Sequence, residues 1–360
     1  MRILFVTRKF PPSVGGMEVF AEELSLALRR KCGDLTLFKP DPPIIGRPGL
    51  FALLRFFAKA SIAVFRGAGN VDVVLFGDAV LTPMAWLAKL RARKVRTVVA
   101  AHGNDVYYAQ GRNASSVAYK AMLKLFSRST DLLIANSSDT ERMAVSLGFR
   151  NTTRILLATR LQPSPSDPVR KQNSILFAGR LIRCKGLAWF IQEVMPKVDP
   201  SIDLLVAGPS WDPSEMEAVL NCPRARYLGS MPRELLPELR AKVIACIMPN
   251  LPAHLSGQNE GFGLSALESA AVGTPVVASN LGGLAEAVIE DITGFLIEPL
   301  DASAFAAKIN GIARWNEENR RQFSVRARQM VVEQFTWNRV ANDYLEEFER
   351  LAAGHSLVRN

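Results

Sequence analysis

The sequence lacks the patterns by which zinc sites, disulfide scaffolds and membrane spans are recognised. Its 360 residues include four cysteines, which lie far apart and form no Cys-x-x-Cys pair. Neither a zinc site nor a disulfide framework is indicated, and a reducing, cytoplasmic compartment is expected. The apolar start of the chain is too short for a signal peptide. The most apolar stretch, 50–65, is interrupted by Arg55 and Lys59 and falls short of the about 20 uncharged residues that span a bilayer.

Motifs of several enzyme classes are also absent. The chain has no Gly-x-x-x-x-Gly-Lys-Ser/Thr phosphate loop, no Gly-x-Ser-x-Gly nucleophile elbow, no His-Glu-x-x-His and no Asp-x-Asp pair that would hold a metal ion. Gly261-x-Gly263-x-x-Ala266 imitates a dinucleotide-binding fingerprint and keeps an NAD(P)-dependent oxidoreductase as an alternative. That fingerprint must follow its strand directly, whereas the loop 249–259 precedes this segment.

Acidic residues are scarce in the first half of the chain. The net charge is +10, and residues 1–167 contribute 24 Lys/Arg against 12 Asp/Glu, while residues 168–360 contribute 20 against 22. A cationic half predicts an anionic partner, which is a nucleic acid, a membrane surface or a phosphorylated ligand. The aromatic platforms interleaved with Lys/Arg that mark many nucleic-acid binders are missing. A basic nucleic-acid-binding protein is therefore the less favoured alternative.

Short β-branched runs alternate with amphipathic stretches throughout the chain. This alternation predicts two doubly wound α/β domains, an N-terminal domain over 1–165 and a C-terminal domain over 170–335. A breaker-rich linker, 162–168, separates them, and the length also favours two cores over one. Strands are predicted at 2–7, 35–38, 71–76, 95–101, 131–135, 154–157, 174–178, 203–207, 243–248, 275–278 and 294–297.

Polar residues that follow these strands are the first candidates for a site, because doubly wound sheets bind ligands beyond the carboxyl ends of their strands. In the N-terminal domain, Gly15-Gly16 opens a helix and leaves amide groups for a phosphate or sugar oxygen, although an ordinary turn has the same sequence. His102 ends a predicted buried strand. It is a candidate hydrogen-bonding or charge-stabilising group, and a core histidine is the alternative.

The C-terminal domain carries paired cations and paired carboxylates. Arg180 and Lys185 lie between the strand 174–178 and a helix expected near residue 187, where two cations form an anion site. Such a site suits a diphosphate that becomes a leaving group. Glu260 lies in a loop and Glu268 about two turns into the next predicted helix, and acceptor-only carboxylates suit sugar hydroxyls. If Glu260 caps that helix, its carboxylate and the free N–H groups share one cleft.

These motifs resemble those of the retaining, nucleotide-sugar-dependent glycosyltransferases of family 4 (glycosyl transferases group 1). The resemblance implies the GT-B fold, in which two Rossmann-like doubly wound domains face each other across a cleft and a C-terminal helix, here 337–352, crosses back to domain one. It extends over nearly the whole chain and rests on Gly15-Gly16 with Glu18, His102-Gly-x-Asp105, Gly179-Arg180-x4-Lys185-Gly186, Glu260-x7-Glu268, Gly273-Thr-Pro-Val-Val, Gly282-Gly283, Glu286 and Thr293-Gly-Phe-Leu.

The resemblance also implies roles for individual residues. Arg180 and Lys185 would neutralise the donor diphosphate, Glu268 would accept from ribose hydroxyls and Glu260 from hydroxyls of the transferred sugar. His102 would support positive charge at the anomeric carbon. The implied catalytic residues are therefore His102, Glu260, Arg180 and Lys185, and the implied donor-binding residues are Gly15, Gly16, Arg180, Lys185, Glu260, Gly261, Phe262, Gly263, Leu264 and Glu268.

For the reaction, the resemblance implies front-face attack, in which the leaving phosphate takes the acceptor proton. Neither an enzymic nucleophile, a cofactor nor a metal ion is then expected, and the donor is expected to be UDP- or GDP-linked. A sugar-binding module without activity is a third alternative. It is less favoured because both glutamates and both cations of the family's pattern are present.

The acceptor is expected on domain one, as in the family, and to be a glycan or a lipid-linked molecule. In the segment 50–66, Arg55, Lys59 and Arg66 share one face of a predicted helix and the rest is bulky and apolar. That composition is typical of a helix lying in a bilayer interface, with a core helix whose cations reach the surface as the alternative. The basic cluster 89–96 would add attraction to an anionic membrane. A peripheral position on the inner face of the cytoplasmic membrane follows as an expectation.

Overall fold

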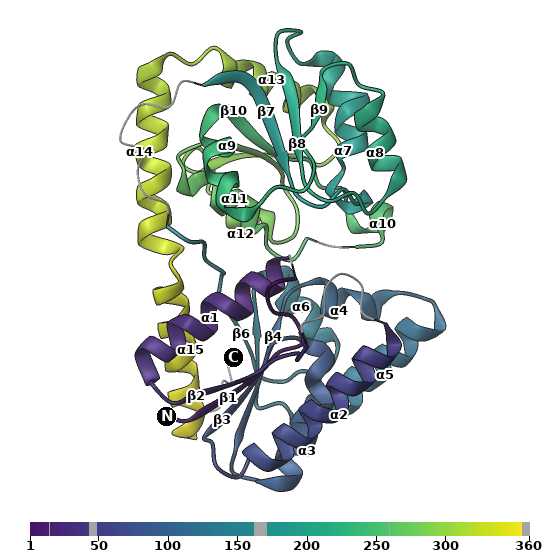
Figure 1. Ribbon diagram of the computed structural model, residues 1–360, viewed down its shortest axis with the longest axis vertical. Coiled ribbons are helices and arrows are strands. Elements are labelled where there is room, and N and C mark those ends of the chain that lie inside the picture. Colours follow the sequence, from purple (N-terminus) through teal and green to yellow (C-terminus); the bar gives the residue numbers. More distant parts are fainter. Residues whose placement is uncertain (14, 43–48, 162–170, 259, 355–360) are drawn as a thin grey trace. The chain divides into compact units, whose positions relative to one another are not determined.

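Two units make up the chain, each built around one parallel six-stranded sheet (Figure 1). The computed structural model describes residues 1–13, 15–42, 49–161, 171–258 and 260–354. Unit 1 comprises Met1–Leu157 and Trp337–Asn360, and unit 2 comprises Ala158–Thr336. The predicted linker 162–168 lies within the stretch 162–170, which is outside the described residues.

Unit 1 has the strand order β2-β1-β3-β4-β5-β6, with every neighbouring pair parallel. Its elements are β1 (Ile3–Val6), α1 (Gly16–Cys32), β2 (Leu35–Phe38), α2 (Leu50–Gly67), β3 (Val73–Phe76), α3 (Thr82–Arg91), β4 (Arg96–Ala101), α4 (Asn104–Tyr107), α5 (Ala114–Phe126), β5 (Leu132–Ala135), α6 (Ser138–Ser146), β6 (Thr152–Arg154) and α15 (Trp337–Ala352).

The central strands of unit 1 are buried on both faces, which is why they read as continuous apolar runs rather than alternating ones. All four residues of β1, β3 and β5 are buried. One face packs against α2, α3 and α5 in a core that includes Phe56, Ala60 and Leu123. The segment 50–66 therefore contributes to the core, and its other side is described below.

The C-terminal helix α15 packs on α1 within unit 1 (Figure 1). The rings of Phe20 and Tyr344 lie 6.3 Å apart, and Phe348 is fully buried beside Tyr344. Arg339 Nη2 donates to the carbonyl of Leu156 across 2.6 Å. The predicted return of helix 337–352 to domain one is thereby confirmed.

Unit 2 has the order β12-β11-β10-β7-β8-β9, again all parallel. Its elements are β7 (Gln172–Ala178), α7 (Leu187–Trp189), β8 (Asp203–Ala207), α8 (Pro213–Leu220), β9 (Ala225–Tyr227), α9 (Leu236–Lys242), β10 (Val243–Met248), α10 (Ala253–Ser256), α11 (Leu264–Ala271), β11 (Val276–Ser279), α12 (Leu284–Ala287), β12 (Gly294–Ile297), α13 (Ala302–Ala313) and α14 (Glu317–Gln334).

The predicted strands coincide with observed strands to within one or two residues, with two exceptions. The strand expected at 154–157 lies earlier, at Thr152–Arg154, and β9 was not predicted because its three residues are mostly exposed. Within the described ranges, no helix combines the length and apolarity that crossing a bilayer requires.

Candidate functional site

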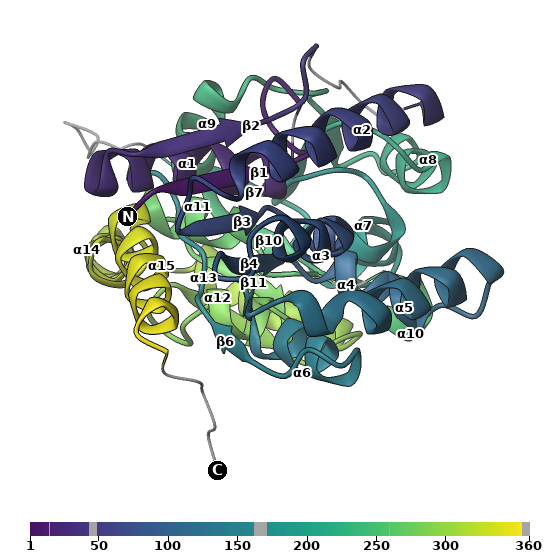
Figure 2. The ribbon, with the colours of Figure 1, turned by 90° about the horizontal axis from the view of Figure 1, so that it is seen from below.

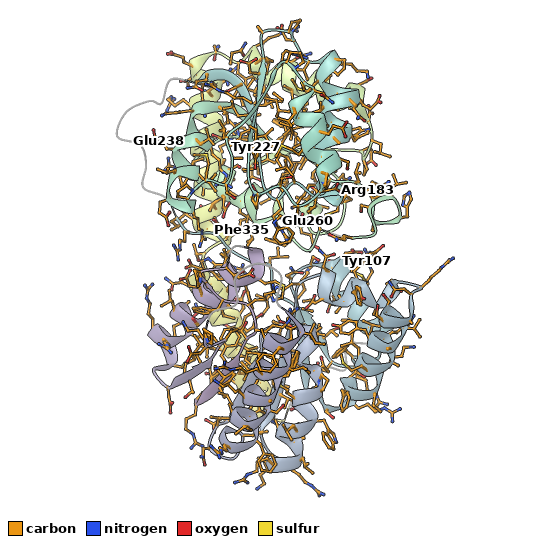
Figure 3. The ribbon with its side chains drawn as sticks, turned by 45° about the vertical axis from the view of Figure 1, so that its right-hand side comes forward. Tyr107, Arg183, Tyr227, Glu238, Glu260 and Phe335 are labelled. Atoms are coloured by element: carbon orange, nitrogen blue, oxygen red, sulfur yellow. The ribbon has the colours of Figure 1, made fainter. Side chains whose placement is uncertain are left out.

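The strand order places a ligand-binding position in each sheet. In unit 2 the strand order reverses at β7 and β10: β8 and β9 are added on one side of β7, and β10, β11 and β12 on the other. Loops that follow such a switch point diverge and leave room for a ligand. These two loops begin at Gly179 and Pro249 and carry Arg180, Lys185 and Glu260. In Figure 3, Glu260 and Arg183 mark this end of unit 2.

Lys185 and Glu260 form an ion pair across the switch point of unit 2. The side-chain amide of Asn250 donates to the same carboxylate oxygen across 2.9 Å. Asn250 is 1% exposed, and none of the described residues bonds to its Oδ1. We define Lys185, Asn250 and Glu260 as the Lys185–Glu260 cluster. It combines a cation, an ionised acceptor and a neutral acceptor at one point.

The charges around Glu260 keep its carboxylate ionised. Burial alone would raise the pKa of Glu260, but the ammonium of Lys185 and the hydrogen bonds from Lys185 and Asn250 outweigh burial and hold the pKa below its ordinary value. The guanidinium of Arg180 acts in the same direction. The carboxylate is therefore an acceptor throughout the neutral pH range.

Glu260 does not cap the following helix, contrary to the possibility raised from the sequence. Helix α11 begins at Leu264, and the residue before it is Gly263 at φ +98°, a left-handed conformation that favours glycine. The carboxylate instead bonds to Lys185 and Asn250, because these side chains follow the two strands of the switch point. Phe262 is buried, so this part of the loop offers a ligand its backbone rather than that side chain.

The loop before α11 is held against a glycine pair. The backbone N–H of Gly283 donates to the carbonyl of Glu260 across 3.3 Å. A Cβ added at Gly283 would lie 2.2 Å from the carbonyl oxygen of Gly261 and 2.4 Å from the Cα of Phe262. Only glycine permits this approach, so Gly283 determines where the backbone of the Glu260 loop lies.

Glu268 projects from α11 and is bound by a residue that sequence reasoning did not single out. Arg240 Nη2 donates to Glu268 Oε2 across 2.5 Å, and Arg240 is almost completely buried. Ser265, one turn earlier on α11, donates to the carbonyl of Ala178 at the end of β7 across 3.0 Å. Glu268 is thus oriented beside the end of β7, with a quarter of its side chain exposed.

Arg180, directly after β7 and Gly179, packs on an aromatic ring. Its guanidinium carbon lies 4.8 Å from the ring centroid of Trp211, a cation–π distance. Trp211 is 42% exposed. The arrangement positions the guanidinium beside the Lys185–Glu260 cluster while leaving Trp211 in contact with solvent.

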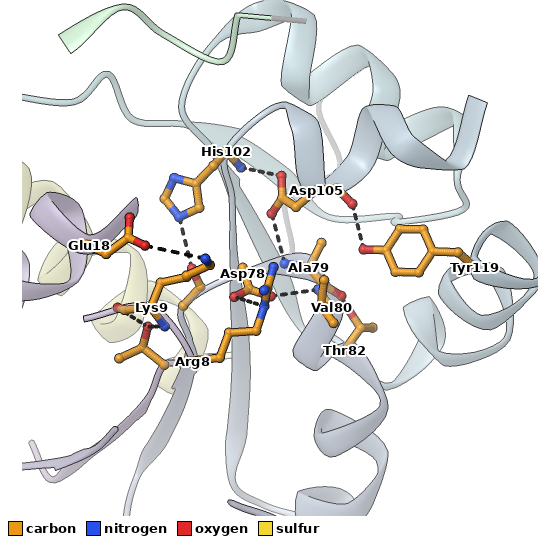
Figure 4. A network of polar contacts seen from close by, with 12 residues as sticks. Arg8, Lys9, Glu18, Asp78, Ala79, Val80, Thr82, His102, Asp105 and Tyr119 are labelled. Carbon is orange, nitrogen blue, oxygen red and sulfur yellow. Dashed lines mark hydrogen bonds and ion pairs between the residues drawn. The ribbon is translucent and has the colours of Figure 1, made fainter. Parts of the chain in front are cut away.

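The switch point of unit 1 lies between β1 and β3 and is closed by an ion pair. Arg8, which follows β1, binds Asp78, which follows β3, across 2.8 Å (Figure 4). Asp78 also accepts from the backbone N–H of Val80. Neither residue was predicted as a site residue, although both follow the carboxyl ends of strands, where ligands of doubly wound sheets bind.

His102 follows β4 and is fixed on several sides. Its Nε2–H donates to the carbonyl of Gly77 across 3.0 Å (Figure 4). Its ring meets that of Phe20 edge-on at 4.4 Å between centroids. Buried Asp105 accepts from the backbone N–H of His102 and from that of Ala79, and burial raises the pKa of Asp105. Asp105 thus ties the loop after β4 to the turn after β3.

Gly15 and Gly16 begin helix α1, as the sequence predicts. A Cβ at Gly15 would lie 2.4 Å from the carboxylate of Glu18, which is buried and pairs with Lys9 at 3.5 Å. A side chain at Gly15 would therefore require the carboxylate of Glu18 to move. One turn further on, Phe20 contacts His102, so the structure places the glycine pair and the histidine in one neighbourhood.

The donor-binding and catalytic roles assigned from the resemblance stay predictions, but the structure gathers their residues into two neighbourhoods. Lys185, Glu260 and Arg180 lie together in unit 2, and Gly15, Gly16 and His102 lie near one another in unit 1. Asn250 could have been found as the polar residue two positions after β10, whereas Arg240 lies before its strand and gave no signal.

Within the described residues, no group of three or more His, Cys, Asp or Glu side chains is arranged to hold a metal ion. A reaction without metal or cofactor also stays a prediction.

Two family models match the chain, one for each unit. The model described as Glycosyl transferases group 1 matches residues 172–314, and the model described as Glycosyltransferase Family 4 matches residues 14–156. Together they take in most of the chain. The chain belongs to the group 1, family 4 glycosyltransferases. The motifs of this glycosyltransferase at Arg180, Lys185 and Glu260 fall within the first match.

Curated relatives align over nearly the full length of the chain or over about half of it. Alpha-maltose-1-phosphate synthase of Mycolicibacterium smegmatis is 25% identical over 402 residues, which is 98% of this chain and 100% of that protein. A D-inositol 3-phosphate glycosyltransferase of Xylanimonas cellulosilytica is 26% identical over 398 residues, 93% and 91% of the two chains. Glycogen synthase of Mycobacterium tuberculosis is 34% identical over 175 residues, 46% of this chain and 40% of that protein.

Solved structures with the same architecture confirm the predicted GT-B fold of two Rossmann-like domains. Sucrose-phosphate synthase of Thermosynechococcus elongatus superposes with a TM-score of 0.75 at 22% identity, covering 99% of this chain and 100% of that chain. HepE of Anabaena, solved with UDP and glucose, superposes with a TM-score of 0.73 at 19% identity, covering 97% and 99%. At these identities the likeness is one of fold.

Proposed function

We propose that this glycosyltransferase moves a sugar from a nucleoside diphosphate sugar to an acceptor hydroxyl, with retention at the anomeric carbon and without a metal ion. The observation that carries the proposal is the Lys185–Glu260 cluster beside Arg180. Two cations suit the diphosphate, and an ionised carboxylate with the unpartnered Oδ1 of Asn250 suits sugar hydroxyls. HepE, which shares the fold, has been solved with UDP and with UDP-glucose, and this supports a UDP- or GDP-linked donor.

In the proposed reaction the anomeric C–O bond of the donor breaks and its electron pair passes to the diphosphate oxygen. The acceptor hydroxyl attacks the anomeric carbon from the same face, and its proton passes to that diphosphate oxygen. Arg180 and Lys185 stabilise the negative charge of the leaving group. His102 supports the positive charge that develops at the anomeric carbon. No side chain is needed as a nucleophile.

The proposed acceptor is a lipid-linked molecule or another cell-envelope glycan, bound by unit 1 at the cytoplasmic side of a membrane. The excess of 24 Lys/Arg over 12 Asp/Glu in residues 1–167 supports an anionic acceptor or surface on this side of the molecule. A small phosphorylated acceptor is the second candidate, because several relatives are D-inositol 3-phosphate glycosyltransferases. Nucleic acid is not expected to bind.

A thermal-shift screen against UDP-, GDP- and ADP-sugars tests the donor, because a ligand that binds the native state raises the melting temperature. We expect sugars of one nucleotide to raise the melting temperature more than the others, and to do so in the presence of EDTA. This increase should be lost in Glu260→Gln and in Lys185→Met. NMR of the transferred sugar tests the stereochemistry. An unchanged transfer rate in Glu260→Gln would contradict the site, an inverted anomer would contradict retention, and inhibition by EDTA would contradict the metal-free reaction.

A further inference from the structure

The outward side of α2 consists of two adjoining strips, one apolar and one basic. At about 100° per residue along a helix, the exposed residues group by chemistry and the buried ones fall on the opposite side. Phe56, Ala60 and Val64 face the core of unit 1. The basic strip holds Arg55, Lys59 and Arg66, and the apolar strip holds Leu50, Phe51, Leu54, Ala58, Ile62 and Phe65.

The apolar strip is well exposed to water. Phe51 is 79% exposed, Leu54 59% and Ile62 52%. Single exposed apolar residues are common on proteins, but here they repeat on consecutive turns of one helix. A contiguous apolar surface of this kind marks an interaction site. One side of α2 is therefore a core surface, and the opposite side exposes the apolar and basic residues that an interfacial helix would use.

The exposed apolar surface continues onto the neighbouring helices. Helices α2, α3 and α5 lie side by side on one face of the sheet (Figure 2). The guanidinium carbon of Arg91 on α3 lies 5.9 Å from the ring centroid of Phe65, and Trp86 on α3 meets Phe126 of α5 at 6.3 Å. We call this surface the α2–α3–α5 face. Beyond α2 it includes the exposed residues Trp86, Leu90, Arg91 and Leu125.

Charge on this face has a single sign. Helices α2, α3 and α5 contain no Asp or Glu, and residues 50–130 hold 12 Lys/Arg against three Asp. Of these three, Asp78 and Asp105 are buried, and Asp72 is ion-paired with Arg2 at 3.1 Å. Just beyond this range, Asp131 is ion-paired with Lys89 of α3 at 2.5 Å. The cations of the basic strip, Arg55, Lys59 and Arg66, lie on a helix without acidic residues.

The apolar strip and the basic strip together favour one kind of binding partner for this face over the others that could cover an apolar surface. A second copy of the chain would bring like charges together across a self-complementary contact, which is unfavourable. A nucleic acid would satisfy the cations but leave Leu50, Leu54 and Ile62 in water. An anionic bilayer accepts apolar side chains at the boundary of the acyl chains and pairs the cations with its headgroups.

We propose that the α2–α3–α5 face docks on an anionic lipid bilayer, with the apolar strip of α2 inserted at the headgroup boundary. The reason for docking rests on the proposed function, since a lipid-linked acceptor is presented at a membrane. The docking itself can be tested without that function, because it depends only on the residues of this surface. The source of the negative charge is the lipid headgroup, and neither donor nor acceptor is required for docking.

Sedimentation with phosphatidylglycerol/phosphatidylcholine vesicles, without nucleotide, measures this docking. We expect the full chain to bind these vesicles, to bind pure phosphatidylcholine vesicles at least tenfold more weakly, and to be released by salt. The triple variant Phe51→Ser/Leu54→Ser/Ile62→Ser should lower binding at least tenfold, and so should Arg55→Ser/Lys59→Ser/Arg66→Ser. Both variants should keep the wild-type melting temperature because the altered residues are exposed.

The matched control alters comparably exposed apolar residues of unit 2, Leu220→Ser/Val325→Ser/Val332→Ser, and should bind vesicles as the wild type does. Glu260→Gln should also bind normally, which separates docking from the donor site. Three results would overturn the proposal. They are equal vesicle binding by wild type and both α2 variants, a concentration-dependent dimer lost in those variants, or nucleic-acid binding that competes with vesicles.

Discussion

The ammonium of Lys185 is ion-paired with the carboxylate of Glu260, although 75 positions separate the two residues in the chain. Their loops follow β7 and β10, the two neighbouring parallel strands between which the strand order of unit 2 reverses. The pair joins the predicted diphosphate ligand to the predicted sugar ligand before any donor is present. If Lys185 binds the diphosphate as proposed, donor binding divides its ammonium between the carboxylate of Glu260 and the phosphate oxygens.

Replacing Lys185 by methionine should change the pH dependence of transfer as well as its rate. Without the ammonium, burial dominates and raises the pKa of Glu260. The acid limb of the rate profile should then move to higher pH, with kcat/KM at neutral pH lowered about 100-fold. Lys185→Arg keeps the charge, and the exposed Lys197→Met serves as the control. A drop in rate with an unmoved acid limb would contradict the coupling of the two residues.

Arg240 should act as a positioning residue for Glu268. Arg240→Met removes the donor that holds the carboxylate, and we expect KM for the nucleotide sugar to rise about tenfold while kcat changes less. If Glu268 accepts from the ribose, a dideoxy nucleotide should bind the wild type more weakly than the natural nucleotide does. The two nucleotides should bind Arg240→Met equally.

The control for Arg240 lies on the same helix. Lys242 forms an exposed ion pair with Glu238 at 2.5 Å, and Lys242→Met should leave both nucleotide affinities unchanged, since exposed pairs contribute little. Calorimetric titration measures these affinities directly. An equal preference for the natural nucleotide in wild type and Arg240→Met would exclude the assigned role.

Gly283→Ala should displace the Glu260 loop without touching a charged group. The added Cβ would meet the backbone of Gly261 and Phe262 at 2.2 and 2.4 Å, which no side-chain rotation can relieve. Nucleotide-induced thermal stabilisation should be lost. Gly311→Ala on α13, where nothing lies within 4 Å, should instead stabilise the protein by up to about 1 kcal/mol. Retained nucleotide binding in Gly283→Ala would show that the loop tolerates displacement.

Glu215 on α8 should make unit 2 less stable as pH rises. Burial raises the pKa of Glu215 to about 7, despite the hydrogen bond it accepts from the N–H of Ala188. Because the folded pKa exceeds that of the unfolded chain, the native state binds more protons and loses stability between about pH 4.5 and about pH 7.

Glu215→Gln keeps the acceptor and removes the titration. The difference in melting temperature between this variant and wild type should grow across the same pH window and then level off. Glu217→Gln, on the exposed side of α8, should show a constant difference. A constant difference for Glu215→Gln as well would mean that the carboxylate titrates normally.

The sequence was sufficient to predict the elements whose formation depends on the residues of one short segment. Strands such as 203–207, 243–248 and 294–297 were placed at their observed bounds because buried parallel strands are continuous apolar runs. The residues at strand ends, Arg180, Lys185 and Glu260, followed from the rule that ligands bind there. The short exposed strand β9 carried no such pattern.

Pairings between distant residues required the structure. Nothing in the sequence says that Glu260 binds Lys185 and Asn250 rather than capping α11, since that choice depends on which strands are neighbours. Arg240 is buried by tertiary packing, and its partner Glu268 lies 28 positions away. Likewise, the pattern of 50–66 suited both a core helix and an interfacial one, and only the structure showed which side of α2 is buried in the core and which is exposed.

Unit 1 is assembled from the two ends of the chain, and this has a consequence for the order of its synthesis. Tyr344 and Phe348 of α15 complete the apolar layer around Phe20, yet the ribosome makes them only after all of unit 2. During translation the apolar surface of α1 that α15 later covers stays exposed while some 180 residues of unit 2 are synthesised. Emergence of α15 from the ribosome is thus the event that completes unit 1, and a chain stalled after Gln334 would expose Phe20 to chaperones and proteases.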